Sequence, residues 1–479
     1  MALTLPKFIV LKPSDNNGYL SYVREGENNL GFLKFFETQA VSPYAKFEVE
    51  ISDTSGLVHI RSCQNNKYWQ RTKTVSIAGV PPGQYWITAT AQNKEEDQSK
   101  ETCTLFKFAP IDHATGPVRI VHVQSGCNLC LWLGSDLILN RCVSANYREF
   151  DSNGFDIFSI IDCKSLLVLP KYVAFKGYNN KYLCVRENYI TFSADDIGDS
   201  TVACETFVTD DGKVHIKSIC AGKFWWADPK WIWVGYDDPS NNDGTTFRPV
   251  KIDDKTIGLI SLANKNFCTT LTGQDHVEWL SPAVPTITKE AKLTVEEPVL
   301  TRDIYDVKYD LGNSRVYDET TFIIAKNFAS NYTQEPTHMD IKLSYTNIKT
   351  STWKSNFSLK LAMEAKMEFN VPLISQGNIE MSGEFHSDVK WEETKESKTL
   401  VDVVHKIVVP AMTKVTVNLI ATKGKCDVPF TFMQSDTLYD GTIVTTAVQG
   451  ATYTGSNYYS IHFETEETKL KPRKKPDPM

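Results

Sequence analysis

The sequence predicts an all-β fold, and three observations point to it. Short runs rich in Val, Ile, Phe, Tyr and Trp are separated by Asn, Gly, Pro and Asp along most of the chain, and almost no stretch has the period of a helix. A segment that begins at Val58 returns at Val214, and a long alternation of apolar and polar residues begins at Phe357. With 479 residues, the chain has room for roughly two to four packed domains of about 150 residues each.

The repeat predicts two tandem copies of one domain. Val58-His59-Ile60-Arg61-Ser62, followed by Lys67-Tyr68-Trp69, corresponds to Val214-His215-Ile216-Lys217-Ser218, followed by Lys223-Phe224-Trp225. The joint is expected near residues 161–170. The first domain is therefore assigned to residues 1–161 and the second to residues 162–298.

Each copy contains a weaker three-fold repeat, in which a small or polar pair precedes an aromatic or apolar group. These groups lie at residues 17–20, 66–69 and 127–131 in the first copy, and at residues 180–183, 222–225 and 265–268 in the second. The spacing fits a β-trefoil, which has three equivalent corners and commonly binds sugars, although a fold alone does not establish a function.

Composition and motifs argue against several function classes. The net charge of −7 argues against a nucleic-acid partner. The chain has no Gly-x-Ser-x-Gly or His-Glu-x-x-His motif, no phosphate-binding glycine loop and no histidines at metal-ligand spacing. We therefore expect neither an enzyme nor a metal or cofactor site.

The N-terminal residues lack a charged n-region, an apolar core and a cleavage site, and the chain has no run of about 18 apolar residues. We therefore expect a water-soluble protein, made without a signal peptide and located in the cytoplasm or nucleocytoplasm. Ten of the eleven cysteines precede residue 270, and the odd total favours buried free thiols over a disulfide framework.

Residues 357–391 are predicted to form an amphipathic β-hairpin. Apolar residues alternate with mostly polar ones from Phe357 to Val371, and the alternation resumes from Ile379 to Trp391 after a turn at Ser375–Asn378. Each arm reaches the roughly 9–11 residues that a membrane-barrel strand needs. Two interpretations remain open: a hairpin that enters a bilayer within a closed barrel, or an ordinary sheet with one buried and one solvated face.

In a membrane barrel the two faces of this hairpin would meet different surroundings. The expected lipid-facing residues are Phe357, Leu359, Leu361, Met363, Met367, Phe369, Ile379, Met381, Phe385, Val389 and Trp391, and the apolar run before the turn, with Val371, Leu373 and Ile374, is expected to insert with them. The expected lumen-facing residues are Lys360, Glu364, Lys366, Glu368, Glu380, Glu384 and Asp388.

Several segments of the first copy resemble the amaranthin-like plant agglutinins. They are Pro82–Ala91, Cys103–Lys107, Phe47–Glu50 and Gly56–Ile60, and the likeness covers residues 1 to about 298. The resemblance implies binding of galactose and N-acetylgalactosamine termini, including Gal-β1,3-GalNAc, at an interface between head-to-tail protomers.

The resemblance assigns Tyr85 and Trp86 to the sugar site, with the neighbouring Gly83 and Gln84. An aromatic face suits the apolar side of galactose, and amide and backbone groups suit its hydroxyls. The counterpart in the second copy is Trp231, within Lys230–Trp233, for which a place in the trefoil core is the alternative.

Residues from about 299 onward resemble the aerolysin-type pore-forming domain. The likeness rests on the hairpin, placed at about 355–392, on Trp353 and Trp391–Thr394, and on the long strands around Val401 to Thr422. It implies an elongated antiparallel β domain at 299–479 that assembles into a homo-oligomer and contacts a lipid membrane in the pore state.

The combined resemblance implies a defence or stress lectin that targets membranes carrying Gal/GalNAc-type sugars, oligomerises and inserts a β-hairpin barrel pore. The alternative is a soluble carbohydrate-binding defence lectin whose third domain only oligomerises. The sequence leaves open whether the second trefoil binds sugar.

Overall fold

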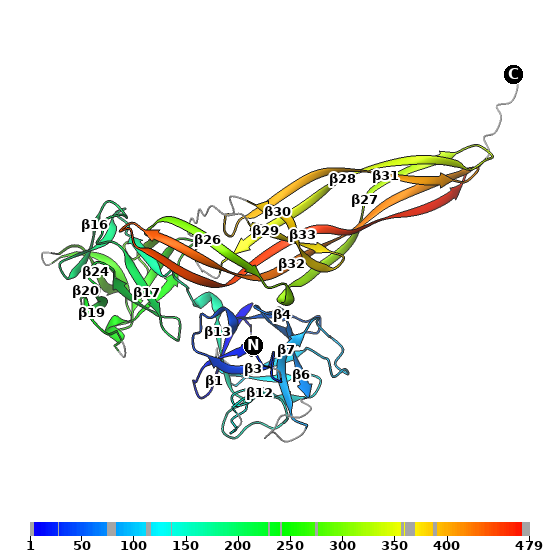
Figure 1. The fold of residues 1–479 in the computed structure, drawn as a ribbon. Helices are drawn as coiled ribbons and strands as arrows, with labels where there is room; N and C mark the ends of the chain where they lie inside the picture. Colours follow the sequence, from blue (N-terminus) through cyan, green and yellow to red (C-terminus); the bar gives the residue numbers. More distant parts are fainter. Residues whose placement is uncertain are drawn as a thin grey trace. The chain divides into compact units, whose positions relative to one another are not determined.

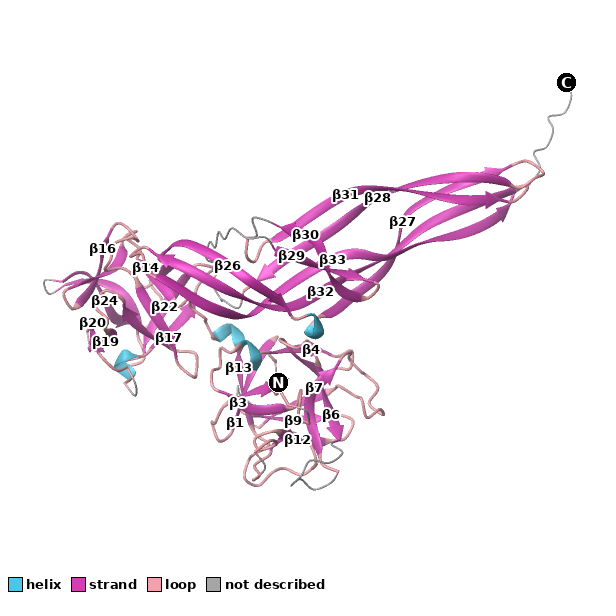
Figure 2. Ribbon diagram, viewed as in Figure 1, coloured by secondary structure: helices cyan, strands magenta, loops and turns pink. Residues whose placement is uncertain are grey.

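The fold comes from a computed structural model of the chain, which describes residues 4–26, 28–73, 83–111, 116–135, 137–228, 230–239, 242–273, 276–355, 359, 369–386 and 390–471. The described residues form β-strands joined by turns and by short 3-10 segments, so the predicted all-β class is confirmed (Figure 2). No helix among these residues is long and apolar enough to cross a bilayer.

The first copy is a sheet closed around a core, with the strand order β10-β9-β13-β1-β4-β5-β6-β7-β12-β11 and β8 paired to β5 and β9 (Figure 1). Its strands are β1 (Phe8–Pro13), β2 (Tyr19–Tyr22), β3 (Leu33–Glu37), β4 (Phe47–Ile51), β5 (Val58–Ser62), β6 (Tyr68–Lys73), β7 (Tyr85–Ala91), β8 (Phe106–Pro110), β9 (Val118–His122), β10 (Cys127–Asn128), β11 (Cys130–Leu131), β12 (Val143–Ser144) and β13 (Phe158–Asp162). The 3-10 segments η1 (Pro43–Ala45) and η2 (Cys163–Ser165) precede β4 and follow β13.

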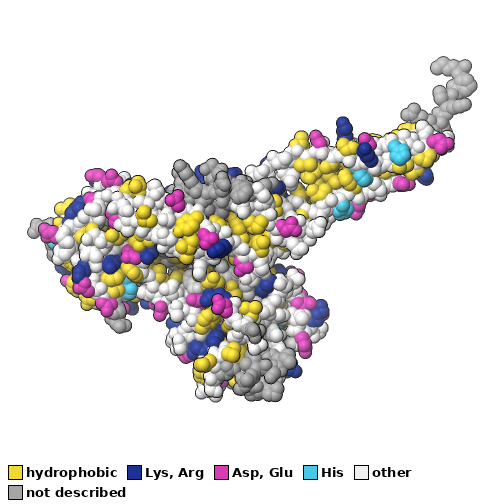
Figure 3. All heavy atoms as spheres, viewed as in Figure 1, with side chains coloured by type: hydrophobic (Ala, Val, Ile, Leu, Met, Phe, Trp, Pro, Cys, Tyr) yellow, Lys and Arg dark blue, Asp and Glu magenta, His cyan; other side chains and the backbone are white. Residues whose placement is uncertain are grey.

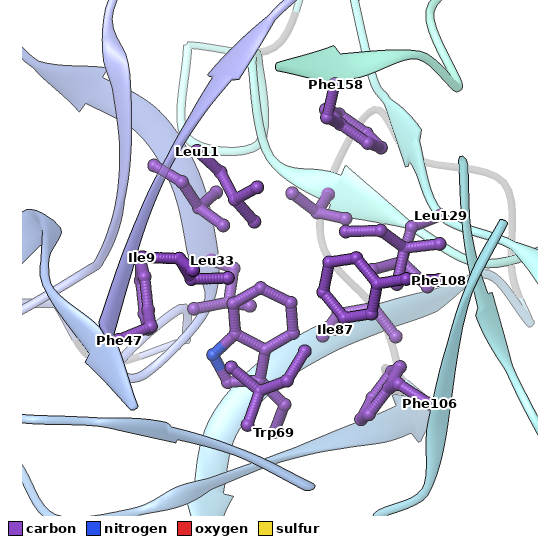
Figure 4. Close-up of a cluster of buried hydrophobic side chains, with 14 of the residues drawn as sticks. Ile9, Leu11, Leu33, Phe47, Trp69, Ile87, Phe106, Phe108, Leu129 and Phe158 are labelled. Atoms are coloured by element: carbon purple, nitrogen blue, oxygen red, sulfur yellow. The ribbon is translucent and has the colours of Figure 1, made fainter. Parts of the chain in front are cut away.

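Trp69 lies at the centre of this core (Figure 4). It is 0% exposed, and its ring meets those of Phe47 and Phe106 edge to face, with centroids 5.1 and 5.8 Å apart. Ile9, Leu11, Leu33, Ile87, Phe108, Leu129 and Phe158 complete the labelled cluster. Such aromatic pairs add to the free energy gained from burying apolar area.

The second copy repeats this plan. Its elements are β14 (Tyr172–Lys176), β15 (Tyr182–Arg186), β16 (Tyr189–Ala194), β17 (Cys204–Val208), β18 (Val214–Ser218), β19 (Phe224–Asp228), β20 (Trp231–Tyr236), η3 (Asp243–Thr245), β21 (Phe247–Lys251), β22 (Thr256–Ser261), β23 (Phe267–Gly273), β24 (His276–Val284) and β25 (Leu293–Glu296).

The registers of the two copies confirm the internal repeat. Phe47 pairs with Ser62 and Ile51 with Val58 between β4 and β5, while Cys204 pairs with Ser218 and Val208 with Val214 between β17 and β18. Trp225 takes the central place in the second core at 1% exposure, as Trp69 does in the first.

The third region consists of long antiparallel strands in the order β26-β32-β33-β28-β31, with β27 paired to β32. They are β26 (Val299–Tyr309), β27 (Arg315–Asn331), β28 (Thr337–Lys354), β31 (Thr394–Val409), β32 (Thr413–Leu438) and β33 (Ile443–Lys469), with η4 (Leu311–Asn313) between β26 and β27 and a separate hairpin of β29 (Phe369–Ser375) and β30 (Asn378–His386).

One face of these strands is packed and the other is solvated. Ile341, Leu343 and Tyr345 of β28 are buried in a cluster with residues of β31 and β32. On the edge strand β31, Leu400 and Val404 are 70% and 51% exposed. Figure 3 shows that apolar side chains gather on the surface of this region.

The described residues form two compact units. The first contains both repeated domains and the segment Met433–Gly450, and the second contains most of the chain from Ile304 onward.

Candidate functional site

The segment predicted to bind sugar lies at the start of β7. Gly83 has φ of +89°, a left-handed conformation that favours glycine. The backbone N–H of Tyr85 donates to Oδ1 of Asn146 at 2.8 Å, and Nδ2 of Asn146 donates back to the Tyr85 carbonyl at 3.2 Å. This paired contact holds the backbone of Tyr85 in place.

The ring of Tyr85 is half-buried and lies against the guanidinium of Arg71. The guanidinium carbon of Arg71 lies 3.4 Å from the ring centroid, and Nε of Arg71 donates to the Ala145 carbonyl at 2.8 Å. Because the guanidinium is anchored, Tyr85 keeps a fixed orientation, with aromatic, guanidinium and amide groups side by side. Such a mixture suits the recognition of a polyhydroxylated ligand.

Trp86 points the other way and belongs to the protein interior. Its side chain is 0% exposed, stacks against Phe32 at 6.1 Å and meets Trp132 edge on at 5.7 Å. Successive residues of a strand face opposite sides, so Tyr85 and Trp86 cannot both line one surface. The burial corrects the expected stacking role of Trp86, while sugar binding by Gly83, Gln84 and Tyr85 stays a prediction.

Trp231 lies in an aromatic cluster of the second copy. It is 8% exposed and meets His276 and Trp279 edge on, at 4.7 and 5.5 Å. The ring of Trp279 is stacked between His276 at 3.6 Å and Tyr189 at 4.0 Å. Sugar binding at Trp231 stays a prediction.

The sequence reasoning missed Trp279, Tyr189 and His276 as neighbours of Trp231. The three come from β16 and β24, which pair through Thr191 and Trp279. Trp231 belongs to β20, which pairs with β16 through Trp233 and Tyr189. These long-range pairings bring the residues together, and the local pattern around each residue carries no signal for them.

The predicted hairpin turn is present. Ser375 pairs with Asn378, which leaves Gln376 and Gly377 as a two-residue loop with φ of +49° and +82°. Positive φ at both positions defines the type I′ turn, whose twist matches that of antiparallel strands. Pro372 follows an irregularity in the ladder, a place where a missing N–H is tolerated.

The side chain of Asn457 in β33 bonds the backbone of the hairpin. Oδ1 of Asn457 accepts from the backbone N–H of Ile374 at 3.0 Å, and Nδ2 of Asn457 donates to the Ile374 carbonyl at 2.9 Å. Asn457 is 5% exposed and Ile374 is 3% exposed, so both bonds are shielded from water. We call this pair of bonds the Asn457 clasp.

The described apolar residues of the predicted insertion hairpin differ in their surroundings. Val371 is 1% exposed, Leu373 and Ile379 are half-buried, and Met381 is 38% exposed. Trp391 is 9% exposed and packs on Phe432, with the centroids 5.2 Å apart.

Leu359 corrects the prediction of a continuous first arm. It lies in a bend outside any strand and is 4% exposed, within the buried cluster of the second copy. Tertiary packing therefore overrides the alternating pattern at this position.

Several predicted hairpin residues cannot be assessed. Phe357, Leu361, Met363, Met367 and Val389, together with Lys360, Glu364, Lys366, Glu368 and Asp388, lie outside the described residues. The side chains of Phe369, Glu384 and Phe385 lie outside the description as well. Of the predicted lumen residues, Glu380 is described, and it is exposed.

The cysteines are all within the described residues and are free thiols, most of them buried. Burial raises the pKa of Cys130 to about 12, so this thiol stays protonated at neutral pH. No group of three or more His, Cys, Asp or Glu side chains among the described residues is arranged to hold a metal ion.

Two family models match the chain. The Agglutinin domain matches residues 3–162 and 167–295, and the Aerolysin toxin matches residues 300–445. A search of curated proteins found no match.

Several solved structures are similar to parts of the chain. A lamprey immune protein is 11% identical, with 64% of this chain and 93% of that chain covered and a TM-score of 0.31. A mosquitocidal holotoxin is 9% identical (64% and 36% covered, TM-score 0.28), and an aerolysin-like protein of Bombina maxima is 13% identical (35% and 99% covered, TM-score 0.24).

Proposed function

The chain belongs to the agglutinin family and continues into an aerolysin toxin domain, and from this premise we propose that it binds Gal/GalNAc-type glycans on a membrane, oligomerises and inserts residues 357–391 as part of a β-barrel pore. The Asn457 clasp is the observation that carries this proposal. It joins the hairpin, which forms a two-stranded sheet of its own, to β33 through side-chain hydrogen bonds.

The first step of the proposed mechanism is attachment through the lectin domains. Tyr85 would lie against the apolar side of a galactose ring, and the neighbouring Gln84, backbone groups and Arg71 would bond its hydroxyls. Trp231 and its aromatic neighbours form the second candidate. Several weak sugar sites on one oligomer raise the effective concentration at the membrane, so modest affinity per site is enough.

The second step is assembly into a head-to-tail dimer or a ring, followed by release of the hairpin. In the barrel every backbone group is paired between neighbouring strands, which is the condition for crossing a bilayer with strands. The apolar face would meet lipid, and the charged face would line water.

We propose no catalytic step and no cofactor, in keeping with lectin and pore-forming families, which are typically not enzymes. We also propose that the soluble form is made and kept in the cytoplasm or nucleocytoplasm. The free thiols support this location, because a reducing compartment preserves them.

Dye release from liposomes tests the proposal. Vesicles with a glycolipid ending in Gal-β1,3-GalNAc should bind the protein and leak, and free N-acetylgalactosamine should suppress both effects. Binding without leakage would replace the proposal by the soluble-lectin alternative, in which the third domain only oligomerises. Absence of binding to every galactoside vesicle would reject the lectin step itself.

A further inference from the structure

His59 and His215 occupy equivalent places in the two copies. Each is the second residue of its strand, and the residue before it pairs with the equivalent phenylalanine, Val58 with Phe106 and Val214 with Phe247. Nδ1 of His59 lies 3.1 Å from the Thr104 carbonyl, and Nδ1 of His215 lies 2.9 Å from the Thr245 carbonyl. The two imidazoles are therefore held by the same backbone contact.

In the first copy, the carboxylate of Glu96 bonds the outer nitrogen of the histidine. Nε2 of His59 lies 2.8 Å from Oε1 of Glu96, and Oε2 of Glu96 accepts from Oγ of Ser52 at 2.7 Å. His59 is 0% exposed as a result. Glu96 therefore occupies the hydrogen-bonding position at Nε2 of His59.

The second copy has a hollow at the equivalent place. Its volume is about 480 Å³, within the range of small-molecule sites. Val208 pairs with Val214 as Ile51 pairs with Val58, so the next residues, Thr209 and Ser52, occupy equivalent positions. The hollow is lined by Thr209, Asp211, Lys213, His215, Asn242, Asp243, Thr246 and Leu262. His215 is only half-buried, and no described residue bonds its Nε2 as Glu96 bonds that of His59.

The hydrogen-bonding groups of the hollow select the class of ligand. A backbone carbonyl only accepts, so Nδ1 of neutral His215 carries the proton and Nε2 is an acceptor. Asp211 and Asp243 add carboxylate acceptors. The ammonium of Lys213 lies 2.6 Å from Oδ2 of Asp211, which balances one of the two negative charges.

Three ligand classes can be compared on this basis. An anion would face the uncompensated carboxylate of Asp243 and could not donate to Nε2 of His215. A metal ion finds no group of three ligating side chains among the described residues. A neutral saccharide both donates and accepts at each hydroxyl, so it satisfies the acceptors and the lysine at once.

We propose that this hollow, which we call the His215 hollow, is a saccharide subsite in which ligand hydroxyls occupy the space that Glu96 fills in the first copy. The inference deepens the lectin part of the proposed function and is independent of the hairpin. The two copies would then differ in function at this position: they share the same strands, but Glu96 bonds the histidine in the first copy and a ligand would bond it in the second.

Imidazole NMR of the full-length protein tests the proposal, with His59 as an internal reference. Methyl galactoside, methyl N-acetylgalactosaminide and methyl glucoside are titrated separately into histidine-labelled protein. At least one of them should shift the Nε2 and Cε1–H signals of His215 and leave those of His59 unmoved. If no glycoside at millimolar concentration moves the His215 signals, the proposal is overturned.

Variants assign the binding to the hollow. Asp211→Asn keeps the shape of the lining and should weaken the Kd of the active glycoside by about fivefold or more, as loss of a hydrogen bond to a charged acceptor predicts. His215→Gln should have a similar effect, and Tyr85→Ala should leave the His215 response intact. An unchanged Kd in Asp211→Asn would overturn the subsite, whereas lost vesicle binding in Tyr85→Ala alone would concern only the first site.

Discussion

Removal of the Asn457 clasp should loosen the hairpin without unfolding the rest of the domain. In Asn457→Leu the side chain keeps its approximate size, but the backbone N–H and carbonyl of Ile374 lose their partners at a site that is 3% exposed. Two hydrogen bonds at about 1 kcal/mol each give a loss of about 2 kcal/mol. This corresponds to roughly a 30-fold shift toward the released hairpin.

Hydrogen exchange measures this shift directly. The amides of residues 369–386 should exchange roughly 30-fold faster in Asn457→Leu, while those of β28 and β31 keep their protection, because local opening exposes only the hairpin. Leakage from glycolipid vesicles should begin sooner in the same variant if release limits insertion.

Asn331 provides the matched control. It is 2% exposed, and its Nδ2 donates to the carbonyls of Glu335 and Val409 at 2.7 and 3.0 Å. Its Oδ1 also accepts from the backbone N–H and from Oγ1 of Thr333, at 2.9 and 2.7 Å. Asn331→Leu should therefore cost at least as much free energy of unfolding, without selective exchange at 369–386. Equal exchange of the hairpin in the two variants, or an unchanged hairpin in Asn457→Leu, would refute the reasoning.

Three further predictions concern the core, the pH response and the pore. Trp86→Ala should lower the free energy of unfolding, measured by urea titration, by about 3–5 kcal/mol because the ring is fully buried. Tyr85→Ala should keep the stability and weaken the free energy of glycan binding by more than about 1 kcal/mol. The opposite pattern would restore Trp86 as the contact residue. Burial lowers the pKa of His122 from 6.5 to about 4, so between these pH values the unfolded chain binds a proton that the folded chain does not, and the free energy of unfolding should fall as pH drops from about 6.5 to about 4. In His122→Gln the urea midpoint should depend less on pH over that interval. An unchanged pH dependence would contradict the assignment. The positions expected to face the lumen from Ser358 to Glu392 carry three lysines and six acidic residues, a net −3 per protomer, so the proposed pore should select cations. A bilayer reversal potential that is anion-selective, or that is unchanged when Glu364, Glu368, Glu380 and Glu384 become Gln, would mean that the expected barrel register is wrong.

The repeat and the hairpin turn could be predicted because each leaves a local signal. Val58–Ser62 and Val214–Ser218 have nearly the same letters, and the structure gives them the same register against β4 and β17. Gln376-Gly377 lies between two alternating runs, where a two-residue turn is favoured.

The roles of Trp86 and Leu359 could not be predicted in this way. Alternation places Tyr85 and Trp86 on opposite faces, but which face is inward depends on Phe32 and Trp132, which are distant in sequence. Leu359 fits the strand pattern and is nevertheless buried in a cluster of the second copy.

Asn457 gave no sequence signal for a different reason. A polar residue in an alternating strand normally faces water, and in β33 such residues are frequent. It lies on the same face of β33 as the buried Ala451, Tyr453 and Tyr459, and it bonds β29 there, a contact between segments far apart in the chain. The same applies to the His215 hollow, which becomes visible only when both copies are compared in three dimensions.

The clasp has a consequence for how the hairpin can evolve. Asn457 bonds Ile374 through its main-chain N–H and carbonyl, which every amino acid except proline provides alike. If the hairpin inserts as proposed, its side chains can therefore change to suit bilayers of different thickness or composition without loss of the attachment to β33. Selection for contact with lipid would then act on the side chains, and selection for attachment to β33 would act on the main-chain atoms of the same hairpin.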